Sequence, residues 1–505
     1  MTKDPLLQLV RRRHPVYAEK IGHWNFVDAT YEGGPAWFAD NIFRYMKEGD
    51  RDYRDRVERA YRFNHTKQVV DLVDKYLFKM SISRKDDAPD SVKRYWKDTT
   101  RSGLDADGFF KRVSTATSMF GRIYIVVDST ATEGFAASKA DEVAGDARVY
   151  TYIVRPQDML DMSVDELGVL NWVLFREHGR DDASPLTSTG KFRKLYRLWT
   201  RDSWTLYEEK SEGRGPAKVV QIETGVNSIG KVPVVIADHN FSDNVYSAPS
   251  LIDDVAYLDR ANANYLSNLD AIIQDQTFSQ LTMPAQGLVA GEDGSEKLVK
   301  MGTSRIFTYN GESPHRPEYI SPDPGQANLI LAAVTKIITE IYSSVGLTAE
   351  RTGSNDGGGE SSGVAKAYDF EKVNSLLAAK AAALELTERK VARMVAEFSS
   401  EQDQMDDDFI KYPIDFDVRG IYDEFEIGAR LSLLAAPEEV RREQMRLVIK
   451  KLFPAASQEL NAKLEASLKL WPPEIIAPGL GDKSAGPAGP LKAAGIQKTA
   501  KEMAS

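Results

Sequence analysis

The chain has 505 residues, of which 42% are hydrophobic and 28% charged, with a formal net charge of −10 and no cysteine. At roughly 150 residues per domain, this length allows about three domains with sizeable cores. The absence of cysteine excludes disulfides, thiol catalysis and zinc sites that need sulfur ligands. The acidic charge disfavours a protein that binds DNA simply by neutralising its phosphates.

The sequence predicts neither a targeting segment nor a membrane span. The apolar run near the N-terminus is too short for a signal peptide. No stretch reaches the roughly 18 consecutive apolar residues that a transmembrane helix needs. We therefore expect no membrane partner, and a place in the cytoplasm or in an assembly built there.

The first 80 residues are predicted to be helical, with apolar side chains at helical spacing over residues 66–80. Residues 121–237 instead contain short β-branched or aromatic runs, separated by Gly, Pro, Asp and Ser. Two of these runs, Leu195–Thr200 and Trp204–Tyr207, flank a polar turn and predict a hairpin. Because no helices separate the strands, we expect a largely antiparallel sheet.

A second helical region begins at Pro249, where apolar residues at a 3-4 spacing predict a helix to about Ser279. Residues 280–325 then break into short extended pieces with several prolines. Asp323 and Pro324 supply the N-cap and first position of another helix, and Gly346 is a natural stop for it.

The glycine-rich stretch 346–363 has too few apolar residues to pack a core, so it predicts a mobile loop. A long helix follows over Val364–Phe398, with a regular apolar stripe. Beyond it we expect an extended piece at 410–418, helices over 424–470, and a poorly packed tail from Trp471.

Enzyme motifs are few. Gly359–Gly363 fits the pattern G-x-S-x-G, but a nucleophile elbow needs a later histidine, and none follows His315. No G-K-[ST] nucleotide motif is present, and no two of the six histidines lie within one helical turn. We therefore predict no enzyme activity, metal or cofactor. A carboxylate-dependent hydrolase using Asp406–Asp408 stays as the alternative function, although a solvated acidic loop is the simpler interpretation.

The order of the predicted parts is the stronger signal. Two long helices around a β insertion cannot bury all their faces alone, which favours packing against copies of the same chain over a monomer. In this order of parts, the sequence resembles the portal proteins of tailed bacteriophages over roughly residues 40–470. The stretches that carry the resemblance are VVDLVDKYLFKM (69–80), GFFKRVSTATSMFGRIYIVVD (108–128), YTYIVRPQDMLDM (150–162), 194–209, 230–240, 247–270 and 360–385.

The resemblance implies an α+β fold that is mainly helical, with an antiparallel-β wing, long stem and tunnel helices, a small α/β clip and a helical crown. Its parts would be a wing at 1–245 with 409–420 returning to it, a stem at 246–279 and 326–346, a clip at 280–325, a tunnel loop and helix at 347–398, a crown at 421–472 and a flexible tail at 473–505.

The implied function is that of a ring, expected to have twelve subunits, at one vertex of the virion capsid. Double-stranded DNA would pass through it during packaging and ejection, without sequence-specific contacts. The partners implied are the terminase large subunit, a head-completion or adaptor protein, the major capsid protein and a scaffolding protein. An acidic subunit agrees with this role, because DNA passing through a pore must not bind tightly.

The resemblance also suggests three groups of functional residues. We expect the DNA channel to be lined by Arg351, Ser354, Asn355, Glu360, Ser361, Ser362, Lys366 and Lys372. The stem helices are expected to contact a neighbouring subunit through Leu269, Ile337 and Ile341. The clip is expected to contact the motor or connector through Lys297, Lys300, Arg305 and Arg316.

Overall fold

The computed structural model is an α+β protein, as the sequence predicts. It divides into two compact units, Met1–Asp417 and Val418–Ser505. The residues that the structure describes are 4–46, 48–129, 148–210, 217–277, 280–284, 307–309, 318–320, 325–347, 363–401, 409–414, 416, 437–452 and 458–469.

Helices form the N-terminal part of the first unit. Pro5, Pro15 and Pro35 each occupy the first helical position, where the missing N–H costs no hydrogen bond. Asp105 caps the last helix by accepting a bond from the Gly108 N–H at 2.9 Å. These helices are α1 (Pro5–Val10), α2 (Pro15–Glu32), α3 (Pro35–Asn41), α4 (Asp50–Arg59), α5 (His65–Leu77), α6 (Asp90–Lys97) and α7 (Ala106–Phe120).

Two antiparallel sheets follow the helices. In the smaller one, β2 (Arg122–Ser129) lies between β3 (Val149–Val154) and β9 (Val234–Asp238). The predicted hairpin is present in the larger one, where Trp199 lies opposite Trp204 with ring centroids 6.0 Å apart. This larger sheet is a meander of β4 (Met159–Val164), β5 (Leu170–Arg180), β6 (Phe192–Thr200), β7 (Ser203–Lys210) and β8 (Lys218–Val226).

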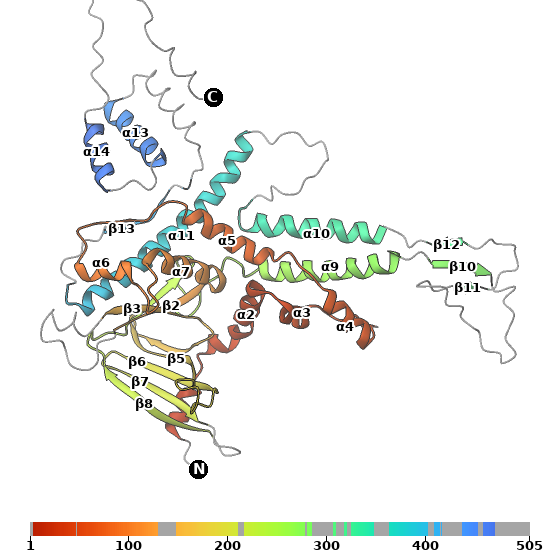
Figure 1. Ribbon diagram of the computed structural model, residues 1–505, viewed down its shortest axis with the longest axis horizontal. Helices are drawn as coiled ribbons and strands as arrows, with labels where there is room; N and C mark the ends of the chain where they lie inside the picture. Colours follow the sequence, from red (N-terminus) through yellow and green to blue (C-terminus); the bar gives the residue numbers. More distant parts are fainter. Residues whose placement is uncertain are drawn as a thin grey trace, which may run out of the picture. The chain divides into compact units, whose positions relative to one another are not determined.

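Two long helices, α9 (Val255–Thr277) and α10 (Gly325–Ser344), lie side by side (Figure 1). They run antiparallel, since the chain leaves α9 into a small sheet and returns through α10. In that sheet, β10 (Gln280–Pro284) pairs in parallel with β11 (Phe307–Tyr309) and antiparallel with β12 (Glu318–Ile320). Gly346 follows α10 with a φ of +72°, as expected of a glycine that ends a helix.

The 36-residue helix α11 (Gly363–Phe398) packs into the core of the first unit. It contacts α5, α6 and α7 and the strands β2 and β9. Its apolar side chains Leu377, Leu384 and Val391 are buried in the main core. After α11, β13 (Ile410–Lys411) pairs antiparallel with β1 (Ser83–Arg84), so this late segment returns to the N-terminal part of the chain.

The second unit contains two described helices, α13 (Glu438–Leu452) and α14 (Gln458–Lys469). They contact each other, and the Arg446 guanidinium binds the Glu465 carboxylate at 2.8 Å. This agrees with the helices expected over residues 424–470.

Gly121 makes a close backbone contact possible where α7 meets β2. It ends α7 with a φ of +76°, a conformation that residues with a Cβ rarely adopt. A Cβ at this position would lie 2.0 Å from the carbonyl oxygen of Ala248, in the segment that leads to α9. The carbonyl of Gly121 also accepts the His239 N–H at 2.7 Å. Glycine therefore lets three separate segments meet here.

We expect Gly121→Ala to lower the free energy of unfolding by about 2–5 kcal/mol, because the new Cβ adds a steric clash to the left-handed strain. Gly168→Ala is the matched control: its φ is +78°, but no atom lies within 4 Å of its Cβ position. The control should lose only about 1–2 kcal/mol. Urea denaturation of both variants measures the difference, and equal losses would contradict the steric explanation.

Candidate functional site: the long helices and their buried charges

Most of the residues predicted to line a channel or to contact partners lie outside the described residues. Lys366 falls within α11, and Lys372 is exposed on the same helix. The residues of the hydrolase alternative, Asp406–Asp408, also lie outside the described part. The other predicted residues outside it are Arg351, Ser354, Asn355, Glu360, Ser361, Ser362, Lys297, Lys300, Arg305 and Arg316.

Burial corrects the expected subunit contact of α9 and α10. Leu269 is only 6% exposed and Ile341 is fully buried, because packing within the single chain already covers them. Ile337 is partly buried against the main core. Leu269 and Ile341 therefore have almost no surface left for a second subunit. The large apolar side chains that these helices do expose are Tyr257, Tyr265, Ile273, Leu329 and Leu331.

A buried carboxylate fixes α9 to the start of α5. Asp259 of α9 has no exposed surface. It accepts hydrogen bonds from the Thr66 N–H at 3.1 Å and the Thr66 hydroxyl at 2.8 Å, and it pairs with the Arg62 guanidinium at 3.1 Å. Because the first turn of a helix presents unpaired N–H groups and a partial positive charge, a carboxylate is favoured at this point.

A second buried carboxylate fixes α11 to β1 and to the chain around β13. Glu388 is fully buried and accepts a bond from the Arg84 Nε at 2.7 Å and from the Tyr412 hydroxyl at 2.6 Å. Arg84 also binds Asp107 of α7 at 2.7 Å. Desolvation by burial raises the pKa of Glu388, and the Arg84 charge opposes that rise.

The third buried charge is Lys380, which lies eight residues before Glu388 on α11. Its ammonium donates to the Ser114 carbonyl at 3.0 Å and the Ser118 hydroxyl at 2.7 Å, both on α7. It also lies 3.0 Å from the Nδ1 of His239, which follows β9. Burial lowers the pKa of Lys380 to about 8, although Asp74 of α5 opposes this shift.

Sequence reasoning missed the buried charges of α11, although a signal was present. The predicted apolar stripe includes Leu377, Leu384 and Val391. Lys380 and Glu388 fall between these residues at the same 3-4 spacing, so both lie on the buried stripe. A charge within such a stripe indicates either a paired buried ion or a break in the helix.

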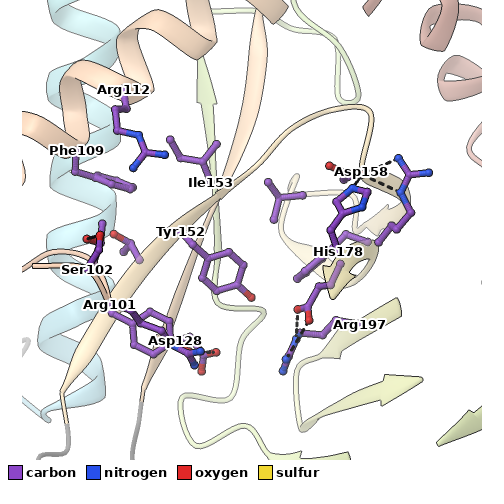
Figure 2. Close-up of a pocket in the computed structure, with 17 residues that line it drawn as sticks. Arg101, Ser102, Phe109, Arg112, Asp128, Tyr152, Ile153, Asp158, His178 and Arg197 are labelled. Carbon is purple, nitrogen blue, oxygen red and sulfur yellow. Dashed lines mark hydrogen bonds and ion pairs between the residues drawn. The ribbon is translucent and has the colours of Figure 1, made fainter. Parts of the chain in front are cut away.

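A cleft of about 540 Å³ lies between the two sheets and α7. Figure 2 shows Tyr152 between Arg101 and Asp128 on one side and Arg197 on the other. The carboxylates of its lining are already engaged: Asp158 binds Arg176 at 2.8 Å and His178 at 3.0 Å, Glu177 binds Arg197, and Asp128 accepts from the Tyr150 hydroxyl at 2.8 Å.

The carboxylates of the cleft are therefore each held by a cation or a hydroxyl. The imidazole of His178 is oriented by Asp158, an arrangement that general bases also use. Burial and the Glu177 charge raise the pKa of Tyr152 well above its ordinary value, so its phenol stays protonated.

The described part of the chain contains no group of three His, Asp or Glu side chains that could hold a metal ion. None of its helices is both long and apolar enough to cross a membrane.

Comparison with known proteins finds structural similarity alone. No model of a known protein family matches the sequence, and no curated protein matches it. The structure is similar to a chain of the virion of a native gene transfer agent particle, at 11% identity and a TM-score of 0.39, covering 75% of this chain and 89% of that one. A chain from the neck of an empty gene transfer agent particle, computed with C6 symmetry, gives 11% identity, a TM-score of 0.35, and coverage of 74% and 90%. At TM-scores below 0.5, neither likeness decides the fold or function of this chain.

Removing one partner of a buried ion pair should be far more costly than removing an exposed one. We expect Arg84→Met to lower the free energy of unfolding by about 3–5 kcal/mol, since Glu388 loses its counter-ion. The matched control is Arg201→Met, whose pair with Asp165 is partly exposed, with 41% and 33% of the two side chains accessible, and should be worth at most about 1 kcal/mol. Chemical denaturation at neutral pH measures both variants.

The pH dependence of this loss has a defined sign. A carboxyl pKa that is raised in the folded state gives stability that is complete at low pH and is lost as the pH rises. Without Arg84 the pKa of Glu388 rises further, so the deficit of Arg84→Met should shrink as the pH falls. A deficit that is constant with pH would contradict the assignment of the loss to Glu388.

Proposed function

We propose that the chain is a portal subunit of a tailed bacteriophage or a phage-like particle. It forms a non-enzymatic ring at one vertex of the capsid, through which double-stranded DNA is packaged and ejected. The order of parts in the sequence supports this proposal, because paired helices around a small β insertion, a glycine-rich stretch and a long helix follow one another in the order that portal proteins share.

The exposed apolar surface of α9 and α10 is the observation that carries the proposal. Isolated exposed apolar side chains are ordinary. Here Leu329 is 73% exposed, Leu331 is 46% exposed and Ile273 is 49% exposed, and all three lie on two helices that contact each other. Leu329 and Leu331 are two residues apart and project from different sides of α10, so each supplies its own exposed apolar surface that a neighbouring subunit would cover. A repeated subunit that offers a different surface to this face forms a ring when the rotation between neighbouring subunits closes.

The remaining roles in the proposal belong to residues outside the described part. The stretch 346–363 connects α10 to α11, so its ends lie at the same two points in every subunit. In a ring, these loops would narrow the channel, with Ser354, Ser361 and Ser362 making weak contacts to DNA. Asp356 and Glu360 would repel phosphates, which keeps the DNA from binding tightly. The basic residues of 280–325 would contact the terminase or the adaptor protein.

The first test of this proposal concerns assembly. We expect native mass spectrometry of the full chain to show a closed ring of about twelve copies of the 56.3 kDa subunit. Leu329→Asp together with Leu331→Asp should abolish the ring, since each would bury an unpaired carboxylate in the contact. Circular dichroism should show unchanged folding, because both side chains are exposed in the single chain.

Leu167→Asp is the matched control for this pair, because Leu167 is 89% exposed in the turn between β4 and β5. The control should form rings of normal mass. Intact rings in the Leu329 and Leu331 variant would remove α9 and α10 from the subunit contact.

The second test concerns the glycine-rich stretch. Deleting Ser354–Glu360 should leave the number of subunits in the ring unchanged, because the deleted residues are too polar and glycine-rich to pack a core. The same deletion should lower the yield of DNA-filled heads in a packaging assay, because the channel would be wider. Normal yields of filled heads would show that this stretch is a passive connection.

A further inference from the structure

Lys380 has more hydrogen-bond acceptors around it than it has hydrogens to donate. Its three N–H bonds meet the Ser114 carbonyl, the Ser118 hydroxyl, the Thr117 hydroxyl at 3.3 Å and the His239 Nδ1 at 3.0 Å. The side chain has no exposed surface. A fully buried ammonium needs acceptors on every side, and these four partly replace the hydration that the charged form of Lys380 loses on burial.

His239 must be neutral for this arrangement to exist. Its Nδ1 can accept a bond from the Lys380 ammonium only when that nitrogen carries no proton. The residue cannot easily move away, because it is 3% exposed and its backbone N–H donates to the Gly121 carbonyl at 2.7 Å. Desolvation and the Lys380 charge lower the pKa of His239 well below its ordinary value.

The other charges around the pair do not replace this contact. Asp74 of α5 is tied to α7 by the Ser114 hydroxyl at 2.5 Å, and burial raises its pKa. Asp253, which favours a charged His239, already accepts from His23 at 2.8 Å. Where β2 and β9 pair, Arg122 and Asp238 form a close ion pair with each other at 2.6 Å. Lys380 and His239 therefore face each other with their nearby charges already engaged.

We propose that Lys380 is a positioning residue that holds α11 at one rotation and one height against α7 and β9, and that His239 makes this hold sensitive to acid. Protonated His239 would place a second cation 3.0 Å from the Lys380 ammonium, inside the core. The contact between α11 and the segment after β9 then breaks. Glu388, two turns further along α11, keeps the C-terminal half of the helix in place.

The sign of the effect follows from the two pKa directions. A histidine pKa that is lowered in the folded state gives stability that is present above its ordinary value of about 6.5 and is lost as the pH falls below it. The pKa of Lys380, about 8, keeps this residue charged through the same window. Acid therefore loosens α11, whereas neutral pH fixes it.

The consequence for DNA passage rests on the proposed function. α11 begins at Gly363, directly after the glycine-rich stretch. In a portal ring, acid-dependent loosening of the first half of α11 would change how firmly the channel loop is held. The hold itself is a property of the single chain and can be measured whether or not rings form.

The test is hydrogen–deuterium exchange of the full chain at about pH 5 and about pH 7.5, on either side of the ordinary histidine pKa. After correction for the intrinsic effect of pH, we expect protection of α11 to fall by about tenfold or more in acid, the change that one pKa unit produces. In His239→Asn, whose amide oxygen takes the position of Nδ1 and accepts the same bond without taking a proton, protection should be equal at both pH values.

Two further variants make the test specific. His178→Gln is the matched control, because His178 lies on β5 with 69% of its side chain exposed and pairs with Asp158, which directly precedes β4. It should keep the drop of the wild type. Lys380→Met should show a smaller drop in acid than the wild type, since no cation then opposes His239; a lysine that merely fills space would leave the drop unchanged.

An acid drop in His239→Asn as large as in the wild type would overturn the proposal, and so would a wild type without any drop. The result is independent of assembly: a chain that never forms rings but shows the His239-dependent drop keeps this inference and loses the portal proposal.

Discussion

Charges without exposed surface hold the longest described helix of this protein in place. Lys380 and Glu388 lie on the buried stripe of α11, and each finds its partners on other elements of the first unit. An apolar stripe alone fixes the position of a helix less specifically, because the hydrophobic effect has no direction. A buried ion has strong directional needs, since losing a partner costs several kcal/mol. Both charges are satisfied together at one position of α11.

The same device recurs at α9, where Asp259 binds the first turn of α5. The helices before and after the glycine-rich stretch are therefore fixed to the same group of N-terminal helices. α9, against which α10 packs, is bound to α5, and α11 is bound to α7. α9 and α10 keep some exposed apolar side chains, Leu329 and Leu331 among them, after these contacts within the chain are made. The account of a ring subunit depends on this division between helix faces used within the chain and faces left for a neighbour.

The spacing of apolar residues, together with the residues that end helices and strands, made much of the fold predictable. The hairpin of β6 and β7, the stop of α10 at Gly346 and the start of α11 follow from alternating patterns, turn residues and glycine. The apolar stripes of α9 and α10 were predicted as well, but the surface against which they pack was not. Periodicity indicates that Leu269 and Ile341 are buried, and it does not distinguish burial by their own chain from burial by a second copy.

The buried charges were missed for a different reason. A lysine or glutamate on a helix is usually solvated, so its residue type alone gives no reason to expect a buried ion at Lys380 or Glu388. The cleft between the two sheets could not be found either, because its lining comes from α7, β3, β5 and β6, which only the folded chain brings together. Residues distant in sequence, such as His239 and Lys380, carry no local pattern that links them.

Electron cryomicroscopy of the purified full chain tests the central claim most directly. The account predicts closed rings with a central channel, in which α9 and α10 contact the neighbouring subunit through Leu329 and Leu331 and the stretch 346–363 faces the axis. A monomer, or a ring in which that stretch lies on the outer surface away from the channel, would contradict it.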